Sequence, residues 1–280
     1  MEPRPILWLL PFSVTERTLP TGSAVARRAP DALARLIART GKVDARWAAL
    51  MLPIEEGEAF AVLLGTADDV DHREHLAFLG GEYLFYGQVD LHQEDVWLDG
   101  RLFSASHKEI LIYPGFQGSA AEFLAWLPVL AFDHLLAAMG VSLSSAEQQR
   151  IRTGLTLDWP AFCAYCDVLD ILSPGPSPPD WQRRALDAIH RALERDPEFE
   201  EAALLGLEVA ERAWAESGLE RAWEIVEALA ARAGDLAPVA AYRARLLARL
   251  GRHTEARREA ARADILKQRR LPPMRDDGCW

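Results

Sequence analysis

The second half of this 280-residue chain repeats one pattern of small and apolar residues at helical spacing. Ala185, Ile189 and Ala192 are spaced four and three residues apart, and the same spacing recurs at 222–229 and 256–263. The first residues of these three sets lie 37 and 34 residues apart. Small side chains at each turn let a helix pack closely on its neighbour, and a period of this length is typical of stacked helical hairpins. The pattern predicts an all-α array of about three hairpins over 158–270.

The first unit carries the pattern most clearly. Its segment "ALDAIHRALERDPEFEEA" (185–202) resembles the second helix and the exit of a tetratricopeptide repeat, with Pro197 ending the helix. The second and third units are more degenerate, and Gly234 falls where the second unit's proline would lie. The resemblance implies that the first helix of each pair lines a groove. Extending the repeat frame places the following residues there: Leu204, Leu207, Glu211 and Trp214 in the second unit, and Ala241, Arg245 and Ala248 in the third.

The first half of the chain alternates strand and helix signals instead. Continuous apolar runs predict buried strands, whereas apolar residues at spacings of three and four predict helices. We therefore expect an α/β domain over 1–142 with a mixed sheet of about five strands. Its predicted strands are 6–12, 46–54, 60–65, 82–91, 94–106 and 109–116, and its predicted helices are 30–40 and 71–81.

Capping signals mark the change to helical sequence. Ser119–Glu122 and Ser144–Glu147 both have the form of a capping box, and Pro128 should kink or split the helix that the first of them opens. We expect a connecting segment over 143–157 and a flexible tail over 271–280.

The order of these segments resembles a known arrangement. The amino-terminal domain of the Tol translocation protein TolB, and related domains of bacterial cyclases and regulators, open on a strand ending "LPF" and continue to a strand of the form Y-x-x-x-G-x-V. In the regulators a helix then begins a repeat array. The resemblance covers about residues 5–268, although 43–71 is diverged. The regulators usually carry a winged-helix, cyclase or kinase domain before this arrangement, and we expect none here. The matching segments are "LLPF" (9–12), "EYLFYGQV" (82–89), "VWLDGRLFSASHKEIL" (96–111) and "CAYCDVLDIL" (163–172).

Charge and composition limit the classes of partner. The net charge of −11 argues against nucleic acid, because phosphate binding needs a basic surface. Residues 243–270 nevertheless carry ten basic and three acidic side chains, which suits either a solvated helix surface or docking of an acidic partner. Three cysteines favour a reducing compartment, and the longest apolar run is ten residues, half of a bilayer span. We expect a cytoplasmic protein with no membrane partner; a homo-oligomer stays open.

The stretch "FCAYC" places Cys163 and Cys166 at a CxxC spacing. A redox pair of this kind has its first cysteine at a helix N-terminus, where the thiolate is stabilised. Here Asp158 is the expected N-cap, so Cys163 falls about one turn too far along the helix. Zinc would need four ligands, and the one other cysteine is Cys279. We expect packing, with thiol redox or metal binding as the alternatives.

Other chemical signals are few. His72 and His75 share a helix face among carboxylates, which could hold a metal, but an acidic first turn is also what the helix dipole favours. The sequence contains no glycine-rich phosphate loop, GxSxG or HExxH. We therefore predict a protein that is not an enzyme and has no cofactor.

These observations predict a scaffold or regulatory adaptor that binds a protein partner through the array and its basic C-terminal helices. The alternative is a sensor that binds a nucleotide or metabolite between its two domains. The repeat face could equally pack on the first domain. The predicted partner-binding residues are Leu204, Leu207, Glu211, Trp214, Arg245, Arg249 and Arg252.

Overall fold

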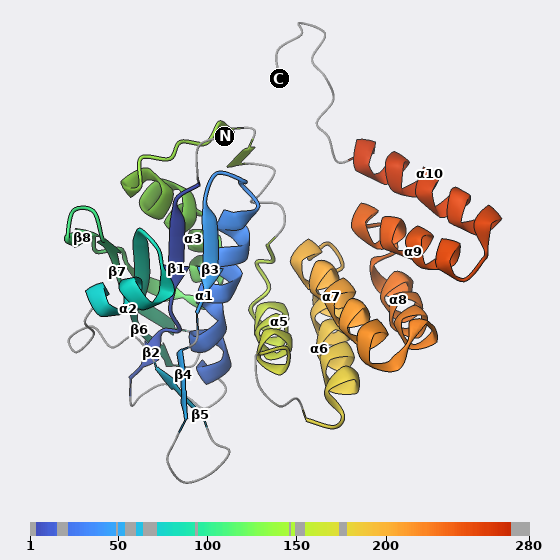
Figure 1. The fold of residues 1–280 in the computed structure, drawn as a ribbon, viewed down its shortest axis with the longest axis horizontal. Helices are drawn as coiled ribbons and strands as arrows, with labels where there is room; N and C mark the ends of the chain where they lie inside the picture. Colours follow the sequence, from blue (N-terminus) through green and yellow to red (C-terminus); the bar gives the residue numbers. More distant parts are fainter. Residues whose placement is uncertain are drawn as a thin grey trace, which may run out of the picture. The chain divides into compact units, whose positions relative to one another are not determined.

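The structure is a computed structural model, and it describes residues 4–15, 22–48, 50–53, 60–63, 72–92, 95–145, 147–148, 155–173 and 178–269. The chain divides into two compact units, residues 1–153 and 154–280. The first contains a mixed sheet with helices, and the second contains only helices among its described residues (Figure 1). The predicted fold class, an α/β domain followed by an all-α array of helical hairpins, is confirmed.

The sheet of the first unit has seven strands. Its main order is β3-β1-β6-β7-β8, while β2 pairs with β6 and β9 pairs with β7. The strands on the β3 side run parallel, and those from β6 to β8 and β9 run antiparallel. The strands are β1 (Ile6–Leu9), β2 (Ser13–Val14), β3 (Asp44–Trp47), β6 (Tyr83–His92), β7 (Asp95–Ser104), β8 (Glu109–Ile112) and β9 (Gly115–Ser119).

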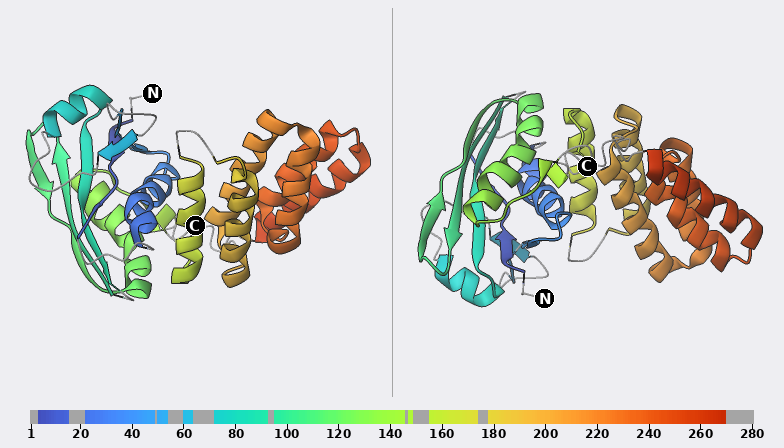
Figure 2. Two further views of the ribbon diagram at one scale, coloured as in Figure 1. Left: turned by 90° about the horizontal axis from the view of Figure 1, so that it is seen from below. Right: turned by 90° about the horizontal axis from the view of Figure 1, so that it is seen from above.

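Helices cover both faces of this sheet. Helix α1 (Gly22–Ala38) connects the first strands to the parallel strand β3, and it lies on the same side of the sheet as α3 (Ala120–Val129) (Figure 2). Helix α2 (His72–Leu79) packs on the other side, where its Leu76 joins a cluster with Leu84 and Tyr86. Because side chains alternate along a strand, Phe85 points to the opposite face. The hydrophobic core is therefore divided into two layers by the sheet.

Two predicted strands are wrong as single elements. The segment 109–116 is divided between β8 and β9, which both pair with β7, and 46–54 is divided as well. The chain forms β3 at Asp44–Trp47 in the main sheet, and then β4 (Leu50–Pro53) pairs with β5 (Phe60–Leu63) in a separate two-stranded sheet. A continuous apolar run carries no information on where the chain changes partner strand.

Strands β6 and β7 form the central hairpin. They pair from Tyr83 with Ser104 to His92 with Asp95, and Gly87 lies opposite Gly100 at the middle. A Cβ atom on Gly87 would lie 2.4 Å from the carbonyl oxygen of Asp99. The glycine of the Y-x-x-x-G-x-V pattern is thus required by a close backbone approach.

Replacing Gly87 with alanine is expected to lower the free energy of unfolding of the first unit by about 2 kcal/mol, since the backbone must shift to admit the methyl group. Gly115→Ala is the matched control, because its Cβ would lie 3.6 Å from the nearest atom, an ordinary contact. Urea denaturation measures both variants. Equal stability of the two would contradict the assignment of a steric role to Gly87.

Both predicted capping boxes are present. Ser119 caps α3 with Glu122, and the backbone N–H of Ser144 donates to Glu147 at 2.7 Å. Hydrogen bonds from Ser144, with Lys42 nearby, lower the pKa of Glu147 to about 2. After Pro128 the helix does not break: it continues as the π-helix η1 (Leu130–Leu136). Proline has no N–H for the carbonyl four residues earlier, and a wider turn directly after it accommodates that loss.

The second unit is a run of helical hairpins. Its helices lie side by side in chain order, and the largest contacts are within the pairs α5/α6, α7/α8 and α9/α10 (Figure 1). First helices also contact first helices, as α7 does α9. The helices are α5 (Trp159–Ile171), α6 (Trp181–Arg195), α7 (Glu200–Ser217), α8 (Leu219–Ala233), α9 (Ala237–Arg249) and α10 (His253–Arg269).

The repeated small and apolar residues lie where these helices pack. The three repeat residues of α6 and the three of α8 are fully buried. On α10, Ala256 and Ala263 are buried, at 8% and 7% exposed, whereas Ala260 is exposed. At the α7–α8 contact a Cβ atom on Gly206 would lie 3.0 Å from Cδ2 of Leu229. The two helices of this hairpin therefore approach closely at Gly206.

Candidate protein-binding face of the helical array

The residues predicted for partner binding on α7 form one stripe along that helix. They recur at spacings of three and four residues, so they share a face. Leu207 is buried, at 8% exposed, and contributes to the core beneath the stripe. Leu204 and Trp214 are half-buried, and Glu211 is exposed.

The predicted residues of α9 lie beside that stripe. Arg245 and Arg249 are both exposed and lie one turn apart, flanked by the exposed Ala241 and Ala248. Because α9 contacts α7, Arg245 reaches Glu211 and forms an ion pair with it. We call Leu204, Glu211, Trp214, Tyr242, Arg245 and Arg249 the first-helix face.

Tyr242 belongs to this face and was not predicted. The guanidinium of Arg245 lies 4.3 Å from the centre of the Tyr242 ring, a cation–π arrangement. Tyr242 is 8% exposed, and no group among the described residues accepts a hydrogen bond from its hydroxyl. Burial raises the pKa of Tyr242, so the hydroxyl keeps its proton at neutral pH. Its position three residues before Arg245 is the sequence signal that places it on the same face.

The ion pair with Glu211 favours the charged form of Arg245. Its hydrogen bond to Glu211 raises the pKa of Arg245. Both side chains remain more than half exposed, so the pair is screened by solvent and contributes little to stability. An exposed pair of this kind can be opened by a competing ligand.

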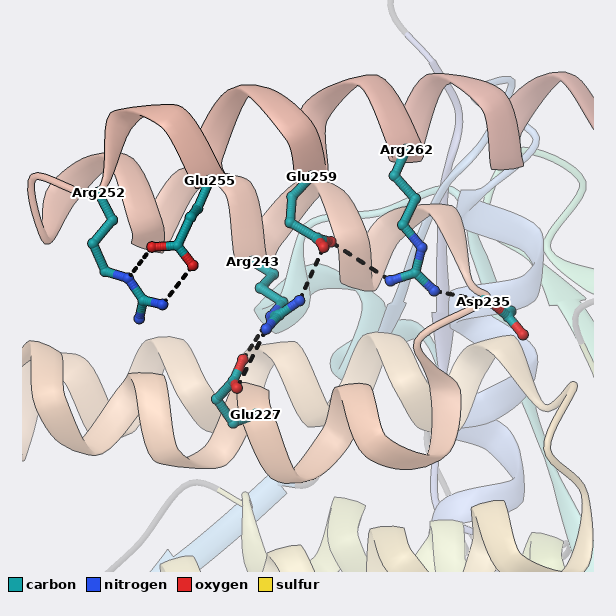
Figure 3. A network of polar contacts seen from close by, with 7 residues as sticks. All are labelled: Glu227, Asp235, Arg243, Arg252, Glu255, Glu259 and Arg262. Carbon is teal, nitrogen blue, oxygen red and sulfur yellow. Dashed lines mark hydrogen bonds and ion pairs between the residues drawn. The ribbon is translucent and has the colours of Figure 1, made fainter.

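Arg252 and two other arginines of the basic segment 243–270, Arg243 and Arg262, have acidic partners inside the array (Figure 3). Arg252 donates to both oxygens of Glu255, at 2.8 and 2.7 Å, and lies over the ring of Trp223. Arg243 of α9 bridges Glu227 of α8 and Glu259 of α10.

Arg262 completes this network by donating to Asp235 at 2.9 Å. The positive charge that is left without an acidic partner among the described residues lies elsewhere on α9 and α10. It is carried by Arg249, Arg257, Arg258 and Lys267.

The CxxC pair lies inside helix α5. Asp158 caps this helix through a 2.8 Å hydrogen bond from the backbone N–H of Ala161, as predicted, so Cys163 is one turn beyond the N-terminus. Cys166 is buried and Cys163 is half-buried, and neither forms a disulfide. Burial, with the charges of Asp167 and Asp158, raises the pKa of Cys163 to about 12. A thiol of this kind is the opposite of the activated thiolate that redox chemistry uses.

In the native protein neither thiol of this pair should react quickly with a disulfide reagent. Because burial raises the pKa of Cys163 to about 12, this thiol stays almost entirely protonated at pH 8, whereas an ordinary thiol is partly ionised there. A Cys279→Ser variant leaves two thiols to count, and both should react at once in denaturant. Fast modification of either in the native state would contradict the packing role.

The structure does not describe the side chains of the predicted histidine pair. Helix α2 begins at His72, while the side chains of His72 and His75 and the residues 68–71 before them lie outside the described part. Across the residues that are described, no group of three or more His, Cys, Asp or Glu side chains is arranged to hold a metal ion. Cys279 also lies outside the described residues.

Three comparisons place this chain against known proteins. No protein-family model and no curated protein matches it. Among solved structures it is similar to TolB from Acinetobacter baumannii, with a TM-score of 0.34 and 12% sequence identity over 51% of this chain and 30% of that one. The chain thus spans under a third of the length of that protein.

None of the described helices is both long enough and apolar enough to cross a bilayer.

Proposed function

We propose that this chain is a non-enzymatic interaction protein of the cytoplasm, in which a TolB-like α/β domain carries tetratricopeptide-like hairpins and the array docks a protein partner. The observation that carries this proposal is the first-helix face. It combines the half-buried side chains Leu204 and Trp214 with the exposed ion pair of Glu211 and Arg245. Aromatic and arginine side chains of this kind are enriched where proteins bind one another.

Two further features support the parts of this proposal. The TolB-like assignment rests on the order of the "LLPF", "EYLFYGQV" and "CAYCDVLDIL" segments in the sequence. The repeat assignment rests on the spacing of the buried small and apolar residues of α6 and α8. A repeat array presents its residues from successive helices side by side, and this suits an extended partner.

The test is recovery of a partner from a lysate of the source cell with the tagged full chain. We expect the wild type to retain a stoichiometric partner and the Arg245→Glu, Arg249→Glu double variant to lose it. The matched control reverses Arg257 and Arg258 of α10 instead, with the same change of net charge, and should keep the partner. Recovery of no partner by any of the three proteins, or of the same partner by all of them, would contradict docking on this face.

A further inference from the structure

The hydroxyl of Tyr242 is a buried polar group whose proton has no acceptor. It has essentially no accessible surface, and no group among the described residues accepts a hydrogen bond from it. Leaving such a group unpaired is unfavourable, and native proteins do so rarely unless the group has a role. Arg245, over its ring, lies close enough to donate to the hydroxyl oxygen, and Glu211 lies close enough to influence the hydroxyl electrostatically.

Arg245 and Arg249 of α9 have N–H groups that are not engaged by other described residues. One Nη atom of Arg245 is engaged by Glu211, and a guanidinium has five N–H groups. Arg249, one turn along the same face, is exposed and has no acidic partner in the described part of the chain. Together with the Tyr242 hydroxyl, these groups offer several donors and one acceptor, the carboxylate of Glu211.

Charge changes sign at this face. Residues 200–236, which form α7 and α8, carry nine acidic and three basic side chains, whereas residues 237–269, which form α9 and α10, carry three acidic and nine basic ones. The pair of Glu211 and Arg245 joins the two regions. An acidic ligand is therefore favoured on the α9 side of the face and not on the α7 side.

We propose that Arg245, Arg249 and Tyr242 form a subsite for a carboxylate side chain of an acidic peptide segment, and that Glu211 occupies this subsite when the partner is absent. This inference rests on the proposed function and names the chemistry of its partner. The ion pair of Glu211 with Arg245 is an example of a carboxylate bound at this site. An incoming carboxylate displaces Glu211 and accepts a hydrogen bond from the Tyr242 hydroxyl. Glu211 does not accept this hydrogen bond. Arg249 supplies the second positive charge.

The test measures binding of a labelled eight-residue peptide of alternating Glu and Leu to the full chain by fluorescence anisotropy, with the Gln-Leu peptide as the uncharged comparison. Arg245→Gln should weaken binding of the acidic peptide about tenfold or more, as loss of a charge-assisted hydrogen bond does. Glu211→Gln should strengthen it several-fold, because the internal competitor is removed. Glu224→Gln on α8 and Arg257→Gln on α10 make the same charge changes elsewhere and should leave the affinity within about twofold.

Tyr242→Phe separates binding from folding. It should weaken binding about threefold to fivefold, the effect of one neutral hydrogen bond, while the melting temperature stays equal or rises because an unpaired buried hydroxyl is removed. The inference is overturned if Glu211→Gln and Arg245→Gln both weaken binding, if the Gln-Leu peptide binds as well as the Glu-Leu peptide, or if the peptide drives self-association instead of binding one chain. If one of these results is found and the partner in the lysate experiment still depends on Arg245, the proposed function stands. Only the inference that the partner offers a carboxylate is then wrong.

Discussion

Leu229→Ala is expected to lower the free energy of unfolding of the helical array by about 3 kcal/mol. Leu229 is fully buried on α8, and truncation of a buried leucine removes its apolar contacts and leaves a cavity. Gly206→Leu should also destabilise the array, by about 2 kcal/mol, because the new side chain meets the methyl groups of Leu229 across the α7–α8 contact. Urea denaturation followed by helical circular dichroism measures both.

The double variant makes this prediction specific. If Gly206 and Leu229 share one packing site, the leucine at 206 fills the space that Leu229→Ala opens, and the double variant should be more stable than the sum of the single effects predicts. Ile189→Val on α6 is a milder control, expected to lower stability by about 1 kcal/mol. Strict additivity of the Gly206 and Leu229 effects would show that the two helices do not approach closely at this point.

Arg243→Ala should lower the free energy of unfolding by about 2 kcal/mol. The side chain is 25% exposed and holds carboxylates from two other helices, so its removal leaves Glu227 and Glu259 without their shared cation (Figure 3). Loss of one member of a partly buried charge network costs more than loss of an exposed pair. Urea denaturation again provides the measurement.

Arg252→Ala provides the matched control for Arg243. Arg252 is more exposed, at 42%, and its ion pair with Glu255 lies within one helical turn. Its removal should therefore lower stability by much less than the removal of Arg243. Equal losses for the two variants would mean that the bridge between α8, α9 and α10 adds nothing to the array.

Much of this fold is predictable from the sequence because its signals are local. Capping by Ser119, Ser144 and Asp158 depends on residues three positions away, and the buried faces of α6 and α8 follow from helical periodicity. The change of partner between β3 and β4 was missed because strand pairing is decided by tertiary packing. The π-helix after Pro128 was missed for a similar reason, since proline alone predicts only a break.

The candidate site was predicted in part. The repeat frame places Glu211 and Arg245 on successive first helices, and the structure brings them into contact. The unpaired hydroxyl of Tyr242 could not be foreseen, because burial of a side chain depends on what packs around it. The basic segment 243–270 shows the same limit: a count of charges does not reveal that Arg243, Arg252 and Arg262 are already held by carboxylates of the array.

Hydrogen exchange of the full chain, with and without the partner recovered from the lysate, tests the docking proposal most directly. Binding on the first-helix face predicts slower exchange in the peptides of α7 and α9, and the same peptides should exchange at the unbound rate in the Arg245→Glu, Arg249→Glu variant. Protection confined to residues 4–148, with α7 and α9 unchanged, would contradict the proposal that the array carries the binding site.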